Sequence, residues 1–275
     1  RNVTGVQTCA LPISMNTLQS IIIAIIEGIT EFLPISSTAH MKFANPLLGI
    51  TTNPFVDLFE IVIQLAAIAS VVVIFRKKFF DFKHYSFYIK LIIAVIPALI
   101  FGAAFKKYID AALGNLNAIA IVMVLGGILL LFIDKIFEKA TTSSIEVSQD
   151  VTYKKSFIIG CFQVLSITFP GLSRSAATII GGMSQQLNKK TALEFSFFLA
   201  VPTMLAASAK STLDVYSSHP EVLSSENLIL LLIGALIAFV VALLSVQFFM
   251  RIVEKKGFAP FGWYRIILGL CILAL

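Results

Sequence analysis

Residues 27–40, EGITEFLPISSTAH, bring two glutamates and a histidine into the chain directly after the apolar segment LQSIIIAII at 18–26. The apolar run from 17 to 33 stops at Pro34, and a second apolar half resumes after a serine-rich break. A helix that crosses a bilayer takes roughly 17–25 residues, and a run this short that ends in proline does not cross comfortably. The stretch therefore predicts a re-entrant helical hairpin over residues 17–48, with its irregular backbone shielded by protein.

A second interrupted segment, TFPGLSRSAATIIGG at 168–182, predicts another re-entrant hairpin over residues 156–187. When the prolines of the two hairpins are aligned, Glu27 falls opposite Gln163, and LPISSTA faces FPGLSRSA with one inserted glycine. Weak internal symmetry of this kind is typical of an inverted repeat, in which broken helices meet near the bilayer midplane.

The composition is that of a polytopic membrane protein. Hydrophobic residues make up 58% of the 275 residues, charged residues only 13%, and the mean hydropathy is +0.93, which excludes an ordinary soluble domain. The net charge of +6 is not accompanied by a basic-aromatic patch or by zinc-ligand spacing, so nucleic acid is not expected as a partner. We expect an all-α integral membrane fold in which six further apolar stretches span the bilayer: 55–75, 88–105, 117–133, 191–209, 227–250 and 261–275. The last stretch is short, so it would tilt or thin the bilayer.

Basic residues in the loops orient these spans, because lysine and arginine near helix ends stay in the cytoplasm. The loop 76–90 has five basic residues against one acid, and 251–257 has three against one, so both are expected inside. Residues 210–226 carry one lysine and three acids, which suits the outside. The first hairpin then enters and leaves from the outside, and the second from the inside. The two halves, 15–137 and 156–275, are thus predicted to form an inverted-topology repeat, each half a re-entrant hairpin plus three transmembrane helices.

Two other parts of the chain are expected to lie outside these repeats. Residues 1–14 lack a starting methionine, a charged n-region and a long apolar core, so we expect a non-native or disordered extension. Residues 138–155 are polar and charge-balanced, as suits a cytoplasmic linker between the halves. Residues 15–275 are accordingly expected to form a single membrane domain.

Two carboxylates in the first hairpin favour a cation site. Glu27 and Glu31 lie four residues apart, so on a helix they share one face about a turn apart. A charge at the membrane centre costs ~2.5–3.5 kcal/mol, and like charges in low dielectric repel unless a cation or a shared proton intervenes. A divalent metal, Mg²⁺ or Ca²⁺, fits these oxygen ligands. The alternative is an interfacial helix with both carboxylates wetted.

Groups after the Pro34 break face the same region. Ser36 or Ser37 caps the next half-helix, whose first amides then stay open towards an anion. His40 lies three residues beyond Ser37, close enough on a helix to approach that anion, although a lone histidine is as often a packing residue. Gln64 either lines the same cavity or bridges two helices, and the sequence leaves both roles open.

The second hairpin gathers the groups of a phosphate receptor. Ser173 is a good N-cap, and the following turn carries Arg174, Ser175 and Thr178. A guanidinium fork, hydroxyls and open backbone amides at a helix N-terminus together suit a phosphate. In the alternative, Arg174 snorkels to the surface while the serine and threonine hydroxyls bond back to the helix backbone.

The two hairpin motifs, EGITEFLPISSTAH and PGLSRSAAT, together resemble the two signature regions of the undecaprenyl pyrophosphate phosphatase family, bacterial integral-membrane enzymes associated with bacitracin resistance. The resemblance extends over essentially the whole chain from Met15, including IVIQLAAI at 61–68 and FSFFLAVP at 195–202. It implies removal of the terminal phosphate from the C55 isoprenyl pyrophosphate, which returns the monophosphate carrier for peptidoglycan and other envelope polymers. Ala39 and Ala176 depart from the family pattern, because glycine is common at both positions.

The resemblance also implies roles for single residues. Glu27 and Glu31 look like the acidic pair that holds a divalent metal, and Arg174 looks like the pyrophosphate clamp. Ser37 and His40 are the candidates for nucleophile and acid/base, and either Ser37 attacks directly or a water does so with His40 as base. The expected substrate-binding residues are Ser173, Arg174, Ser175, Thr178 and Gln64.

The partners and the location follow from the same interpretation. We expect a multi-pass protein of the bacterial cytoplasmic (inner) membrane, surrounded by membrane lipid. Its expected substrate is a polyprenyl pyrophosphate lipid, and the sequence leaves open whether it forms a homodimer. Because the first hairpin enters from the outside, the active site is expected to face the periplasm or exterior. The principal alternative is a secondary transporter or flippase of polyprenyl phosphate, because inverted repeats with broken helices are the usual transporter design. A nonenzymatic scaffold would leave the intramembrane charges unexplained.

Overall fold

The computed structural model describes residues 15–137 and 149–274, and every regular element in these ranges is helical. The first half contains α1 (Thr17–Thr30), α2 (Ser37–Leu47), α3 (Pro54–Ile74), α4 (Arg76–Phe79), α5 (Tyr85–Ala104), α6 (Lys106–Leu113) and α7 (Leu116–Ile136). The second half contains α9 (Tyr153–Thr168), α10 (Arg174–Ser184), α11 (Lys189–Ser218), the 3₁₀ turn η1 (Pro220–Val222), α12 (Ser225–Lys256) and α13 (Ala259–Leu273). The expected extension 1–14 and most of the expected linker 138–155 lie outside the described residues.

Among the described residues, five helices are long and apolar enough to cross a membrane: α3, α5, α7, α11 and α12. They confirm the all-α, multi-pass membrane fold and five of the six expected spans. The sixth expected span, 261–275, corresponds to α13, which has 15 residues. At 1.5 Å per residue α13 is about 22 Å long, which is shorter than the ~30 Å hydrocarbon core. α11 and α12 are longer than expected, with 30 and 32 residues.

Both expected hairpins are broken helices in the structure. α1 and α2 flank the turn that contains Pro34, and α9 and α10 flank a second break. Of the two candidate caps for α2, Ser36 is the cap, because it accepts a hydrogen bond from the Ala39 amide. Ser173 caps α10 in the same way, through the Ala176 amide. Both cap residues have positive φ, 72° and 75°, a conformation that residues other than glycine adopt rarely, so the two breaks share one backbone geometry.

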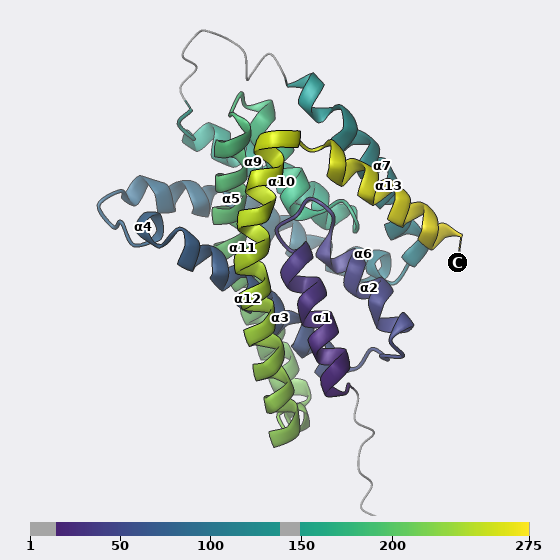
Figure 1. The fold of residues 1–275 in the computed structure, drawn as a ribbon. Coiled ribbons are helices and arrows are strands. Elements are labelled where there is room, and N and C mark those ends of the chain that lie inside the picture. The colour runs from purple at the N-terminus through teal and green to yellow at the C-terminus, as the bar shows by residue number, and fades with distance from the viewer. Residues whose placement is uncertain (1–14, 138–148, 275) are drawn as a thin grey trace, which may run out of the picture.

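Helices of the first half pack on helices of the second. α1 packs against α12 and α9 against α5, α7 lies along α13, and α3 contacts both α11 and α12. An inverted repeat would match the helices of the two halves in order: α1 with α9, α2 with α10, α3 with α11, α5 with α12 and α7 with α13. Under this matching the α1–α12 contact is equivalent to the α9–α5 contact. Figure 1 shows the α11–α12 connection at one end of the molecule and the α12–α13 connection at the other. The inverted-topology repeat is compatible with these pairings and stays a prediction.

α7 and α13 approach each other closely enough for their backbones to touch at two glycines. A Cβ at Gly127 would lie 2.8 Å from the Gly262 carbonyl oxygen, and a Cβ at Gly262 would lie 2.7 Å from the Gly127 oxygen. Small residues at a helix interface permit such an approach inside a membrane. The contact holds the next turn of α13, which carries Arg265, against α7.

Gly127→Val is therefore expected to destabilise the protein by roughly 1–3 kcal/mol, the usual cost of overpacking a filled interior. Gly102→Val is the matched control, because Gly102 also lies in a spanning helix but a Cβ there meets nothing within 4 Å. Thermal unfolding of both variants in one detergent measures the effect. Equal unfolding midpoints would contradict the close packing of α7 on α13.

Candidate active site

Glu31 lies where the two hairpins meet, and its carboxylate is shared by groups from both. Its Oε1 accepts a hydrogen bond from Arg174 Nη2 at 2.9 Å, which is an ion pair between the first hairpin and the second. Its Oε2 accepts from the Ser37 hydroxyl at 2.6 Å and from Gln64 Nε2 at 3.5 Å. The structure thus brings four expected site residues together, from α2, α3, α10 and the turn after α1.

Arg174 is the first residue of α10, and its side chain contacts the protein interior. Its Nη1 donates to the Ser196 carbonyl oxygen on α11 at 3.2 Å, and its Nε is buried without a partner among the described residues. The side chains of Arg174 and Glu31 are 13% and 5% exposed, so the ion pair is almost completely removed from solvent. Snorkelling to the surface is thereby excluded. A guanidinium with an unused N–H beside a helix N-terminus can bind an anion.

Three hydroxyl groups of the second hairpin hold the site together. The Thr178 hydroxyl lies 2.9 Å from the carbonyl oxygen four residues earlier in its own helix and 2.6 Å from the Ser196 hydroxyl. Ser175 donates to the Leu33 carbonyl oxygen of the first hairpin at 2.9 Å. Ser173 is the N-cap and hydrogen-bonds to Ser175 at 3.0 Å. The alternative for these hydroxyls was a hydrogen bond back to their own helix, and Thr178 makes such a bond. The Thr178 hydroxyl therefore positions α10.

Glu27 is fully buried, and neither of its carboxylate oxygens has a hydrogen-bond partner among the described residues. The charged groups that act on it are the carboxylates of Glu31 and Glu60 and the guanidinium of Arg174. A buried carboxylate beside a second one needs a proton or a cation. Within the described ranges no three His, Cys, Asp or Glu side chains gather, so Glu27 and Glu31 would hold a metal without a third side chain of these types. This donor set fits Mg²⁺ or Ca²⁺.

His40 has hydrogen-bond partners outside the Glu31 cluster. Its Nδ1 lies 2.7 Å from the Ser36 carbonyl oxygen, and its Nε2 lies 2.7 Å from the Tyr264 hydroxyl on α13. Because a carbonyl oxygen can only accept, Nδ1 carries a proton, and the neutral ring accepts from Tyr264 through Nε2. The two rings are stacked with centroids 5.6 Å apart. Sequence reasoning missed Tyr264, because nothing in the motifs links the last apolar stretch to the first hairpin.

Arg265 on α13 joins both hairpin breaks and is fully buried. Its Nη1 donates to the carbonyl oxygens of Pro34 at 2.9 Å and Leu172 at 2.7 Å, and its Nη2 donates to that of Gly171 at 2.8 Å. Its Nε donates to the Met123 carbonyl oxygen on α7 at 3.2 Å. One guanidinium therefore satisfies carbonyl groups that the broken helices leave without an intrahelical partner.

The sequence did contain a signal for Arg265 that the motifs did not reveal. An arginine inside an apolar stretch that enters the membrane is by default a hypothesis of function, because burying its charge costs free energy. Gly126 supplies the space, since a Cβ at this position would collide with the Arg265 guanidinium. The two breaks leave carbonyl groups in need of a partner, and the identity of that partner depends on the contact between α7 and α13.

Arg265→Lys is expected to destabilise the protein by roughly 3 kcal/mol, because lysine keeps the buried charge but loses the planar fork that reaches several carbonyl groups at once. Arg251→Lys, on an exposed position of α12, is the matched control. Thermal unfolding in detergent compares the two variants. An Arg265→Lys protein as stable as the control would contradict the role of Arg265 as the joint between the hairpins.

Comparison with known proteins adds an independent finding to this geometry. The family model described as bacitracin resistance protein BacA matches residues 20–271. A protein of Flavobacterium johnsoniae named undecaprenyl-diphosphatase is 48% identical, over 94% of this chain and 96% of its own length. Proteins of the same name from Porphyromonas gingivalis and Bdellovibrio bacteriovorus are each 44% identical, over 93% and 95% of this chain and 95% and 96% of their own lengths. The resemblance carried by the two hairpin motifs is thus confirmed, and the chain belongs to the bacitracin resistance protein BacA family.

Proposed function

We propose that this chain is an undecaprenyl-diphosphatase, which hydrolyses undecaprenyl pyrophosphate to undecaprenyl phosphate and inorganic phosphate. The observation that carries the proposal is the ion pair of Glu31 with Arg174, which joins an acidic hairpin to the N-terminus of α10 inside a multi-pass membrane protein. A helix N-terminus with an arginine is suited to bind an anion. The names of the relatives support this reaction over transport of polyprenyl phosphate. By returning the monophosphate carrier, the reaction serves peptidoglycan synthesis and resistance to bacitracin.

The pyrophosphate head group binds, in this proposal, where Arg174 contacts Glu31. Arg174 Nη2 exchanges a carboxylate oxygen for a phosphate oxygen, and the unpartnered Nε offers a second N–H on the same edge of the guanidinium. The first amides of α10 add donors and the positive end of a helix dipole. The polyprenyl tail stays in lipid, so only the charged head group has to enter between the helices.

Hydrolysis needs a nucleophile beside the terminal phosphorus and a base for its proton. The Ser37 hydroxyl already donates to Glu31, which supports a direct attack in which Glu31 takes the proton as the new P–O bond forms and the anhydride bond breaks. Undecaprenyl phosphate leaves, and water then releases phosphate from Ser37. In the alternative a water attacks with His40 as base, and His40 Nε2 would then have to exchange the Tyr264 hydroxyl for that water. The contact between Ser37 and Glu31 favours the first version.

Glu27 and Glu31 are the proposed ligands of the divalent metal, Mg²⁺ or Ca²⁺. The unpartnered oxygens of Glu27 support this assignment, because a buried carboxylate otherwise has to be protonated. When bound, the metal supplies positive charge to the phosphate oxygens as charge spreads over the transferring group. Gln64 donates to Glu31 and so orients that carboxylate. The remaining expected substrate-binding groups, Ser173, Ser175 and Thr178, hold α10 and its N-terminus in place.

The protein is proposed to lie in the bacterial cytoplasmic membrane with the active site facing the periplasm or exterior. The basic segments 76–90 and 251–257 favour one side and the acidic segment 210–226 the other. Figure 1 places the start of α1 at the same end of the molecule as the α11–α12 connection, which belongs to the acidic segment. This arrangement supports a first hairpin that opens to the outside.

Phosphate release from undecaprenyl pyrophosphate by the purified protein tests the proposed reaction. Glu31→Gln and Arg174→Ala are each expected to lower kcat/KM by roughly 100-fold or more, because each removes charge that the transition state requires. A chelator is expected to abolish release, and added Mg²⁺ or Ca²⁺ to restore it.

The matched controls are Glu254→Gln and Arg251→Ala, which remove the same charges from exposed positions near the end of α12. Both controls are expected to keep wild-type release. Undiminished release by folded Glu31→Gln and Arg174→Ala would refute the site, and transport of polyprenyl phosphate in liposomes without any hydrolysis would refute the reaction.

Labelling of engineered cysteines in intact cells tests the orientation. In a background with the native cysteines replaced by serine, Lys83→Cys in the basic segment is expected to resist a membrane-impermeant maleimide, because this segment is predicted to be cytoplasmic. Ser218→Cys at the end of α11 is the accessible control, since both positions are exposed in the structure. Labelling of Lys83→Cys from outside, with protection of Ser218→Cys, would invert the proposed orientation.

A further inference from the structure

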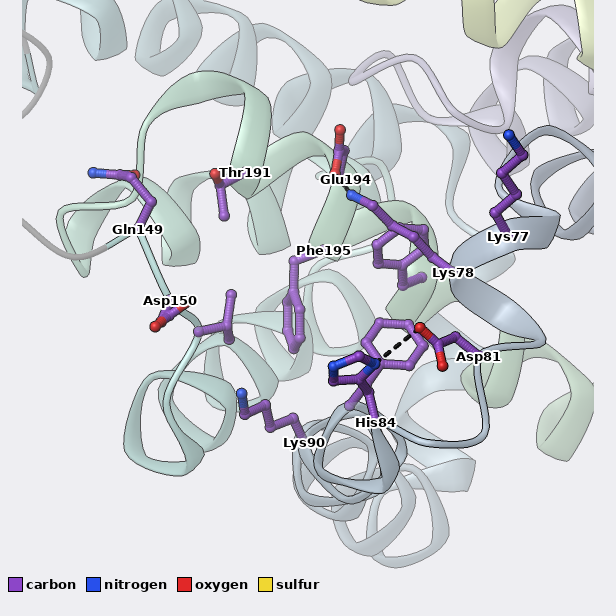
Figure 2. A pocket seen from close by; sticks show the side chains of 13 residues that line it. Lys77, Lys78, Asp81, His84, Lys90, Gln149, Asp150, Thr191, Glu194 and Phe195 are labelled. Carbon is purple, nitrogen blue, oxygen red and sulfur yellow. Dashed lines mark hydrogen bonds and ion pairs between the residues drawn. The ribbon is translucent and has the colours of Figure 1, made fainter.

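A separate cavity lies at the basic end of the molecule, and none of the groups around Glu31 lines it. It has a volume of about 380 Å³ and is bounded by α4, α5, the start of α11 and the segment that precedes α9. Three phenylalanines and three lysines are among the residues that line it: Phe87, Phe195, Phe198, Lys77, Lys78 and Lys90. Figure 2 shows Phe195 near the middle of this group, with Lys90 on one side and the Lys78–Glu194 pair on the other.

The charges around this cavity leave an excess of cations after internal pairing. Glu194 forms an ion pair with Lys78, and Asp81 lies 2.9 Å from Nδ1 of His84. Lys77 has no ion pair among the described residues, and Lys90 contacts the ring of Tyr153 rather than a carboxylate. Asp150 also lines the wall and has an interaction of its own. Lys77 and Lys90 are therefore the cations that an anionic ligand would meet in this cavity.

Helix ends add to this positive field. Three long helices begin beside the cavity, α5 at Tyr85, α9 at Tyr153 and α11 at Lys189. Each N-terminus carries about half a positive charge. α5 also begins without a side-chain cap, and of its first three amides that of Phe87 already donates to the His84 carbonyl oxygen, which leaves those of Tyr85 and Ser86 for an acceptor.

We propose that this cavity binds the phosphodiester head group of an anionic phospholipid, with the first acyl methylenes on its phenylalanine side. The lysines and helix N-termini are complementary in charge to the phosphodiester. The three phenylalanine rings suit contact with a lipid acyl chain, which a free ion does not have. Because the segment 76–90 predicts the cytoplasmic side, the lipid comes from the inner leaflet.

The cavity is connected to the active site through one turn of α11. Glu194, Phe195 and Phe198 line the cavity, while Ser196 between them accepts from Arg174 Nη1 and bonds to Thr178. A lipid that fixes this turn also fixes the carbonyl group that holds Arg174. The coupling rests on the proposed function, whereas the binding of the lipid does not.

Native mass spectrometry of the purified protein, titrated with phosphatidylglycerol or phosphatidylcholine in mixed micelles, tests the binding. The wild type is expected to retain one phosphatidylglycerol in preference to phosphatidylcholine. Lys77→Gln/Lys90→Gln is expected to weaken that binding by about tenfold or more. Lys255→Gln/Lys256→Gln, with the same charge change at the exposed end of α12, is expected to bind like the wild type.

Equal phosphatidylglycerol binding by the two double variants would overturn the site. Displacement of the lipid by millimolar glycerol 3-phosphate would overturn the lipid assignment in favour of a soluble phosphate. The coupling is measured as hydrolysis in nanodiscs with and without phosphatidylglycerol. The rate of hydrolysis is expected to change with this lipid in the wild type and in the Lys255→Gln/Lys256→Gln control, and not in the cavity variant. Equal changes in all three proteins would refute the coupling and leave the binding result unaffected.

Discussion

The guanidinium of Arg265 donates hydrogen bonds to carbonyl oxygens at both helix breaks, those of Pro34, Gly171 and Leu172. Backbone groups inside a bilayer have no water to bond to, so each break in a helix creates acceptors that the protein has to satisfy. A single buried cation satisfies acceptors from both breaks at once, and these bonds offset the cost of burying its charge. The two hairpins are therefore fixed to each other as well as to α13.

Because the two helix breaks are fixed to each other, the polar groups of the site meet. Glu31 follows the end of α1, and Arg174 begins α10. Joining the two breaks therefore brings the Glu31 carboxylate into contact with the Arg174 guanidinium. Ser175 adds a direct bond between the tips through the Leu33 carbonyl oxygen. Glu27 gains no such partner within the part of the chain that the structure describes, and its burial is a cost to stability that a bound cation would offset. The unpartnered Glu27 carboxylate is thus buried where the proposed substrate and metal bind.

The sequence predicted the features that depend on local chemistry. Proline and serine at each break predicted the broken helices and the N-cap at Ser173, and five of the six spans predicted from hydropathy are confirmed. The motifs also predicted Glu31 and Arg174 as site residues. Other features depend on tertiary contacts that leave no local pattern, such as the pairing of His40 with Tyr264. The last apolar stretch, 261–275, was predicted within two residues of α13 at each end, so the sequence already showed that this helix is short.

The central claim is that two hairpins form one catalytic unit through the pair Glu31 and Arg174. A double-mutant cycle on kcat/KM for undecaprenyl pyrophosphate, with Glu31→Gln, Arg174→Ala and the double variant, measures this directly. Residues that act as a unit are strongly non-additive, so the double variant is expected to be about as slow as the slower single variant. Losses that multiply in the double variant would show that the two residues act independently, and would contradict a shared site at the hairpin junction.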